Sequence, residues 1–167
     1  GNGGDDTREG EEGFDYIVGG AGNDILGGGS GADNFVYNDI SEITGFTDYI
    51  YDFSGLNGDG DTITIDGSLL GSIGSNTNNL FDLLSDFDFY LGNVGIDQTA
   101  AIDGTLGGIN PSVIYLQGDA NNRSELYIDT NGASVGGSYK IAEFEGYTSV
   151  SSEDITLVNH NSFPALP

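Results

Sequence analysis

Two hydrophobic patterns divide the chain. Up to residue 36, single apolar residues recur every nine positions within glycine-rich polar sequence, at Ile17, Leu26 and Phe35. Beyond Tyr37, apolar and polar residues alternate in short runs, which is the period of a strand with one buried face. Because turn sequences such as NGDG, GDANN and DTNG separate these runs, we expect antiparallel strands. The runs cover residues 48–53, 61–66, 112–118, 124–129, 138–144 and 154–158.

One later segment has helical periodicity. In residues 78–87, apolar side chains share one helical face, and an asparagine can cap the first turn. The sequence therefore predicts one short helix packed on a sheet. The apolar positions are Leu80, Leu83, Leu84 and Phe87, and the candidate caps are Asn78 and Asn79.

The glycine-rich part consists of four consecutive nine-residue blocks: GNGGDDTRE, GEEGFDYIV, GGAGNDILG and GGSGADNFV, which span residues 1–36. Every block has glycine at positions one and four and aspartate at position six, whereas position eight is apolar in the last three blocks and Arg8 in the first. A flexible linker is the alternative interpretation, but a linker does not keep aspartate in register with an apolar residue two positions later. The repeated aspartates are Asp6, Asp15, Asp24 and Asp33.

Each block suits a turn followed by a minimal strand. Glycine adopts positive φ, so the first six residues can form a tight turn, and the alternating last three place one side chain inward. If two blocks make one coil of a solenoid, residues 18 apart in the sequence stack, which brings Asp6 close to Asp24 and Asp15 close to Asp33. Such carboxylates repel unless they are protonated or bridged by a cation, and Ca²⁺ accepts carboxylate and carbonyl oxygens.

Composition narrows the function further. Against 27 Asp and Glu the chain has three Lys and Arg, and the resulting net charge of −24 makes nucleic acid and anionic membranes unsuitable partners. Cysteine is absent, which excludes disulfides and thiolate chemistry. No apolar stretch approaches the roughly 20 residues that span a bilayer, and the first residues do not form a signal peptide. We interpret the chain as the C-terminal piece of a longer protein, with its export information elsewhere or at its own C-terminus.

Little in the sequence indicates catalysis. The single histidine, His160, lies in the tail, so a Ser-His-Asp site is not expected, and no carboxylate pair is marked as lying in an apolar pocket. We expect a protein that is not an enzyme. The tyrosines could form a carbohydrate-contacting surface or could serve strand packing. They are Tyr16, Tyr37, Tyr49, Tyr51, Tyr90, Tyr115, Tyr127, Tyr139 and Tyr147.

The nonapeptide resembles the calcium-binding repeat of RTX (repeats-in-toxin) proteins, G-G-x-G-x-D-x-U-x, where U is large and apolar. The last two blocks match in full, and the first two carry Asn2 and Glu11 in place of the second glycine. The resemblance implies a parallel β-roll that binds each ion between blocks 18 residues apart. One block supplies the carbonyls at positions two and four and its aspartate. The other supplies the carbonyls at positions one and three and its aspartate.

Carried to this chain, the resemblance implies two calcium sites and two half-sites. The first site consists of Asn2, Gly4, Asp6, Gly19, Ala21 and Asp24, and the second consists of Glu11, Gly13, Asp15, Gly28, Ser30 and Asp33. The half-sites need ligands from beyond the repeats, and they are Gly20 and Gly22 with Asp24, and Gly29 and Gly31 with Asp33.

The segment after the repeats resembles that of the protease members of the family, D-x-I-x-D-F…G-x-D-x-I, because residues 48–65 are DYIYDFSGLNGDGDTITI. The resemblance implies Asp48 as the closing ligand, with Asp39 and Asp52 as further candidates. Residues 57–62, NGDGDT, begin like an EF-hand loop but lack its glycine at position six and its glutamate at position twelve. We expect a polar turn there.

The last third of the chain, from residue 124 to residue 158, resembles the C-terminal target domain of large type I secreted RTX proteins. The resemblance lies in an apolar strand, a D-x-N/D-G turn and a late D-I-x-L strand. The tail, residues 159–167, is uncharged apart from His160. It suits an uncleaved export signal or is a frayed terminus without a role.

We therefore expect an all-β chain with three parts: a parallel β-roll at 1–36, an antiparallel, sandwich-like flanking region with one short helix at 37–158, and a tail at 159–167. The expected function is a calcium-binding C-terminal module of a large secreted RTX protein, such as an adhesin of a Gram-negative bacterium. It would be unfolded in low-calcium cytosol and would fold on extracellular Ca²⁺ after passing the type I secretion apparatus. The alternatives are a carbohydrate- or cell-surface-binding module and the C-terminal domain of a secreted protease, lipase or epimerase.

Overall fold

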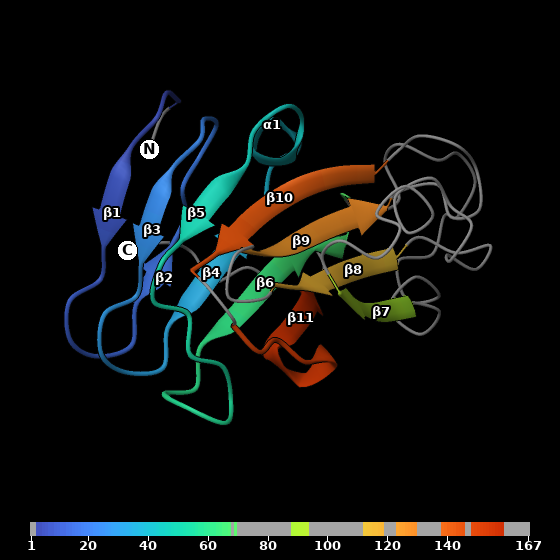
Figure 1. The fold of residues 1–167 in the computed structure, drawn as a ribbon. Coiled ribbons are helices and arrows are strands. Elements are labelled where there is room, and N and C mark those ends of the chain that lie inside the picture. Colours follow the sequence, from blue (N-terminus) through green and yellow to red (C-terminus); the bar gives the residue numbers. More distant parts are fainter. Residues whose placement is uncertain are drawn as a thin grey trace.

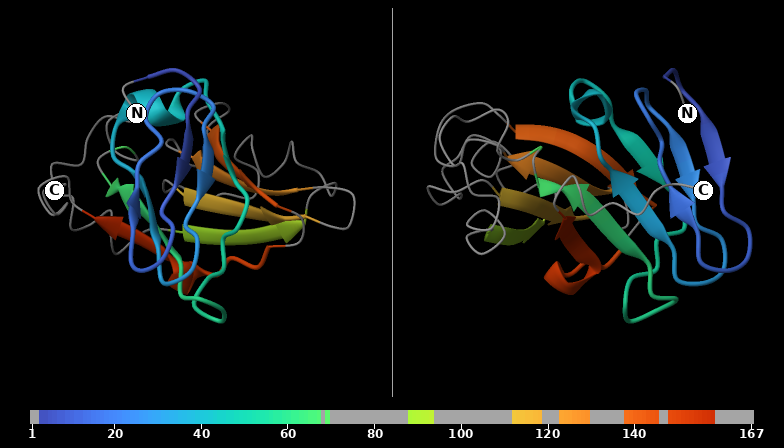
Figure 2. Two further views of the ribbon diagram at one scale, coloured as in Figure 1. Left: turned by 90° about the vertical axis from the view of Figure 1, so that its left-hand side faces the viewer. Right: turned by 180° about the vertical axis from the view of Figure 1, so that it is seen from behind.

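The computed structural model describes residues 3–67, 69, 88–93, 112–118, 123–129, 138–145 and 148–158. These residues form two β-sheets packed face to face, with short parallel strands on one side of the molecule and longer strands on the other (Figures 1 and 2). The all-β prediction is confirmed. One sheet has the order β1-β3-β5-β10-β9-β8-β7, and the other has the order β11-β6-β4-β2.

The four repeats form four short strands, β1 to β4, and most of the strands that follow are longer. The repeat strands are β1 (Thr7–Glu9), β2 (Tyr16–Ile17), β3 (Ile25–Gly27) and β4 (Asn34–Tyr37). The later elements are α1 (Ile40–Ile43), β5 (Asp48–Ile50), β6 (Thr62–Asp66), β7 (Asp88–Asn93), β8 (Ser112–Gln117), β9 (Ser124–Asp129), β10 (Ser138–Phe144), a 3₁₀ turn (Ser152–Asp154) and β11 (Ile155–Val158).

Consecutive coils stack with the register of 18 residues that the repeats predict. β1 pairs in parallel with β3, with Thr7 opposite Ile25, and β2 pairs in parallel with β4, with Tyr16 opposite Asn34. The apolar residue at position eight of the last three blocks points inward, as the burial of its side chain shows. These residues are Ile17, Leu26 and Phe35. The parallel β-roll is therefore confirmed.

The roll continues beyond the nonapeptides. β5 pairs in parallel with β3, and β6 pairs in parallel with β4, so a third coil stacks on the second. The prediction of antiparallel strands at 48–53 and 61–66 is therefore wrong. The connections 38–47 and 51–61 are long enough for each strand to cross to the other sheet before the next begins, which alternation alone does not reveal. The division of the chain after residue 36 stays a prediction, and both sheets continue across it.

The flanking strands extend the same two sheets. β10 and β11 add in parallel to β5 and β6, and β7 pairs in parallel with β8. The prediction of an antiparallel strand at 154–158 is wrong, because β11 lies at the edge of its sheet and pairs in parallel with β6. Antiparallel pairing, as expected for this region, joins β8 to β9 and β9 to β10. The bounds of β8, β9, β10 and β11 agree with the alternating runs to within one residue, whereas β7 was not predicted.

A short helix lies between β4 and β5. Asp39 caps α1, since its carboxylate accepts the N–H of Ser41, while the Glu42 carboxylate accepts the N–H groups of Asn38 and Asp39. The predicted helix at 78–87 and the tail at 159–167 lie outside the described residues. Among the residues that are described, no helix is long and apolar enough to cross a membrane.

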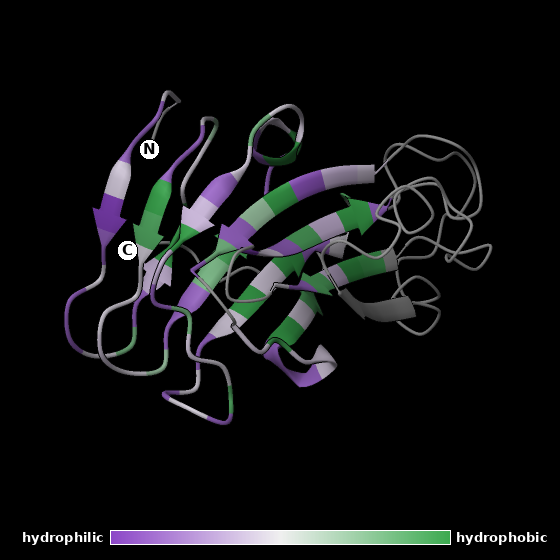
Figure 3. Ribbon diagram, in the orientation of Figure 1, coloured by the Kyte–Doolittle hydropathy of each residue, from purple (hydrophilic) through white to green (hydrophobic). Residues whose placement is uncertain are grey.

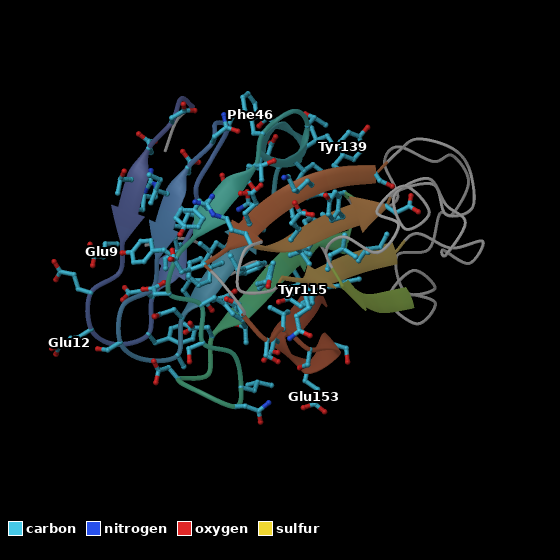
Figure 4. The ribbon with its side chains drawn as sticks, in the orientation of Figure 1. Glu9, Glu12, Phe46, Tyr115, Tyr139 and Glu153 are labelled. Carbon is cyan, nitrogen blue, oxygen red and sulfur yellow. The ribbon has the colours of Figure 1, made fainter. Side chains whose placement is uncertain are left out.

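One hydrophobic core joins the roll to the longer strands. The rings of Phe35, Phe53, Phe144 and Tyr115 form a continuous series with centroid separations of 6.0, 5.4 and 6.0 Å. Figure 3 shows apolar segments in β3, β6, β8 and β9, and hydrophilic sequence in β1 and the turns of the roll. The turns lie outside this core: Figure 4 shows Glu12 at the outer edge of the roll, on the turn between β1 and β2. The roll and the flanking strands therefore pack directly against each other through one shared core.

Candidate calcium-binding site

Aspartates stack in two columns where the strands of the roll begin. Each of these aspartates stands two residues before an inward position of its strand, and each column has one member in every coil. The first column is Asp6, Asp24 and Asp48, before or at the start of β1, β3 and β5. The second is Asp15, Asp33 and Asp61, before β2, β4 and β6.

Main-chain hydrogen bonds hold each column together. The N–H of each aspartate in the first two coils donates to Oδ1 of the aspartate in the next coil, so one carboxylate oxygen of each acceptor is fixed by the stacking. The N···O distances are 2.7 Å for Asp6 to Asp24, 3.0 Å for Asp24 to Asp48, 2.9 Å for Asp15 to Asp33 and 2.9 Å for Asp33 to Asp61. The expected approach of Asp6 to Asp24 and of Asp15 to Asp33 is thereby confirmed.

The second oxygen of two repeat aspartates has no hydrogen-bond partner in the part of the chain that the structure describes. Asp24 Oδ2 and Asp33 Oδ2 are buried and accept no hydrogen bond from the described residues. The two residues are 1 % and 0 % exposed. A buried carboxylate oxygen without a hydrogen bond or a counter-charge is costly. A cation that prefers oxygen ligands fits these two positions.

Two carboxylates converge on Gly19. A Cβ atom added to Gly19 would lie 2.6 Å from Asp24 Oδ2 and 3.1 Å from Asp48 Oδ2. Asp33 Oδ2 lies against Gly28 in the same way. The carboxylates of Asp24 and Asp33 each lie against position one of their own block, and this contact leaves no room there for a side chain larger than that of glycine. The structure brings Asp48 to Asp24, as the resemblance implied for a closing ligand.

Burial and neighbouring negative charges disfavour the anionic form of several carboxylates. Burial raises the pKa of Asp48 to about 7, and the charge of Asp24 adds to this shift. Burial likewise raises the pKa of Asp33, Asp61 and Glu42. A bound divalent cation reverses this balance, because it stabilises the ionised form of its ligands.

The turn carbonyls predicted as ligands lie between neighbouring coils. The carbonyl of Ala21 accepts the N–H of Gly4 at 2.6 Å, and the carbonyl of Ser30 accepts the N–H of Gly13 at 2.8 Å. Each carbonyl oxygen has a second lone pair, so these bonds do not prevent metal binding. Glu11 has φ 81°, a value that the glycine of the motif adopts more readily. Asn2 lies outside the described residues.

The half-site glycines all have the positive φ expected of the turns, and they are Gly20, Gly22, Gly29 and Gly31. The two other candidate closing ligands have different positions. Asp39 is exposed at the cap of α1, where its carboxylate accepts the N–H and the hydroxyl of Ser41. Asp52 accepts the N–H groups of Gly28 and Gly29, at 3.0 and 2.8 Å.

Asp61 is the column member that sequence reasoning missed. It is 2 % exposed although it belongs to the segment predicted as a polar turn. The signal was present, because Asp61 is followed two positions later by Ile63, as Asp24 is followed by Leu26 and Asp48 by Ile50. The signature Asp-x-apolar marks every member of the two columns except Asp6, whether or not a glycine-rich turn precedes it.

The candidate metal-ligating oxygens thus belong to paired carboxylates and to main-chain carbonyls. Within the described residues, no group of three or more His, Cys, Asp or Glu side chains forms a metal site by itself. A stacked parallel roll with unpaired buried carboxylates at its turns defines a repeat protein of the β-roll class. Residues 1–35 match the family model of the RTX calcium-binding nonapeptide repeat, in four copies. The chain therefore carries RTX calcium-binding repeats. The comparison with curated proteins gave no match.

Proposed function

We propose that this chain is a calcium-dependent folding module of a secreted RTX protein, loosely structured in low-calcium cytosol and folded by extracellular Ca²⁺ after type I secretion. One observation carries the proposal. Asp24 and Asp48 come from different coils, are 1 % and 2 % exposed, and direct a carboxylate oxygen each toward Gly19. Such a pair is stable as two anions only with a counter-charge.

The residues of the roll act through stacking. When Ca²⁺ is bound it supplies positive charge and accepts oxygen ligands. Asp24 belongs to the second coil and Asp48 to the third, so the pair exists only when the coils are in register. Binding free energy is then folding free energy. Without the cation, the net charge of −24 opposes compaction.

Tyr37 links the first column to the flanking strands. Its hydroxyl donates a hydrogen bond to the carbonyl oxygen of Ile141 in β10, at 3.4 Å, and its interaction with the Asp48 carboxylate lowers the pKa of Asp48, against the larger effect of burial. β10 also pairs directly with β5, which begins at Asp48. We propose that order passes from the calcium columns to the flanking sheet through these contacts and the shared core.

Circular dichroism and thermal unfolding test the proposal. Ca²⁺ is expected to increase the strand signal and to raise Tm, and chelation is expected to reverse both. Matched additions of NaCl and Mg²⁺ are the controls, since salt screens a highly acidic chain and Mg²⁺ dehydrates reluctantly. An unchanged spectrum and Tm on chelation would contradict calcium-dependent folding, and equal effects of NaCl would reduce it to screening.

We further propose that the module binds and does not catalyse. The carbohydrate-binding alternative depends on an exposed tyrosine surface, and several of the described tyrosines pack inside the sheets instead. Tyr37, Tyr115 and Tyr127 are 2 %, 0 % and 8 % exposed. They support the strand-packing role, so we put forward the folding module.

A further inference from the structure

The third coil closes the two aspartate columns differently. In the first column, Asp48 directs Oδ2 toward Gly19, where Asp24 Oδ2 also lies. In the second column, both oxygens of Asp61 accept main-chain N–H groups. Oδ1 accepts from Asp33 at 2.9 Å, and Oδ2 accepts from Ser54 at 2.8 Å. The carboxylate of Asp61 is therefore committed to backbone donors, unlike those of Asp24 and Asp33.

The Asp52 carboxylate accepts the Gly28 N–H, which in a longer array would donate to a main-chain carbonyl of the next coil. In the first coil, the N–H of Gly10 donates to the carbonyl of Gly27 in the second coil, at 3.1 Å. Gly28 is the equivalent of Gly10 one coil later, and its N–H donates to Asp52 Oδ1 at 3.0 Å. A side-chain carboxylate thus replaces the main-chain carbonyl that a further nonapeptide would supply.

The two N–H groups that donate to Asp52, those of Gly28 and Gly29, form an anion-binding concavity. Gly29 has φ 88° and donates to Asp52 Oδ2 at 2.8 Å, so successive amides of Gly28 and Gly29 point at the same carboxylate. Successive amides arranged in this way bind anions. A cation placed there would meet the positive ends of the N–H dipoles, so this geometry opposes metal binding at Asp52.

We propose that Asp52 and Asp61 end the second column without a metal, so that the half-site of Gly29 and Gly31 with Asp33 takes no calcium. The first column, in contrast, binds an ion between Asp24 and Asp48. The roll therefore stops by two devices: a metal-bound aspartate on one side and hydrogen-bonded carboxylates on the other. The inference rests on the proposed function, because it concerns which end of the array the ion occupies.

Equilibrium dialysis of Ca²⁺ with Asp52→Asn and Asp48→Asn tests the inference on the full chain. Asp52→Asn is expected to keep the number of bound ions and to lower Tm of the calcium-loaded protein by about 2–6 °C, because one charge-assisted hydrogen bond is lost. Asp48→Asn is expected to lose one bound ion. Asp59→Asn is the charge-matched control, since Asp59 is exposed in the same loop, and it should change neither value.

Loss of a bound ion in Asp52→Asn would overturn the inference. If that variant does not fold, anomalous diffraction at a wavelength sensitive to calcium, from crystals of the unmodified protein, decides the question. A peak between Asp24 and Asp48 with none at Asp52 or Asp61 supports the inference, and a peak at either of the latter overturns it. An unmodified protein that binds no calcium would instead contradict the proposed function.

Discussion

Replacing Asp24 by alanine is expected to weaken calcium binding about a hundredfold, which corresponds to about 2.7 kcal/mol, whereas replacing Asp6 is expected to weaken it only about threefold. Asp24 is 1 % exposed and lies between Asp6 in the coil before and Asp48 in the coil after. The Asp6 side chain is 45 % exposed and lies 3.9 Å from the Arg8 guanidinium. A buried ligand shared by two levels contributes more than an exposed one at the end of a column.

Calorimetric titration of Ca²⁺ into both variants measures the difference, and Asp24→Asn refines it. Asparagine keeps an acceptor for the N–H of Asp6 but removes the charge. In chelator, Asp24→Asn should be no less stable than the unmodified protein, because it relieves the repulsion with Asp48. In saturating Ca²⁺ the same variant should be less stable. Equal effects of Asp24→Ala and Asp6→Ala would show that the coils are not in this register.

The repeats were predictable because their period is rigid. Four blocks with glycine, aspartate and an apolar residue at fixed places specify a turn, a ligand and an inward side chain, and the 18-residue coil follows from these. The alternating runs at 112–118, 124–129 and 138–144 were predictable for a similar reason, since alternation specifies one buried face.

The third coil was not predictable in the same way. Alternation at residues 48–53 and 61–66 indicates strands, but the direction of pairing depends on the path of the connection. The 38–47 connection contains α1, capped by Asp39 and Glu42, and its direction depends on where the folded strands β4 and β5 lie in opposite sheets. The position of Asp52 likewise depends on N–H groups that are free because no fifth nonapeptide follows the fourth. These features are set by the tertiary structure, and no repeat in the sequence indicates them.

The second large effect concerns stability: alanine at a position-four glycine should destabilise the roll strongly where the coils are in contact and only weakly where they are not. Gly13 and Gly31 both occupy position four of their blocks, with φ 121° and φ 126°. A Cβ on Gly13 would have nothing within 4 Å, whereas a Cβ on Gly31 would collide with the main-chain carbonyl of Gly13 in the coil before. Both alanine variants carry the same backbone strain, and only one blocks the coils from approaching.

Gly31→Ala is therefore expected to cost about 3–5 kcal/mol of unfolding free energy, from strain and overpacking together, and Gly13→Ala only about 1–2 kcal/mol, from strain alone. Thermal unfolding in saturating Ca²⁺ should show Gly31→Ala melting several degrees below Gly13→Ala. Neither substitution removes a carboxylate or a carbonyl, so the difference reports the contact between coils, which includes the displacement of the Gly13 carbonyl by a side chain at Gly31. Equal melting temperatures would mean that β2 and β4 do not stack as the structure has them, since a side chain at Gly31 could then be accommodated at no extra cost.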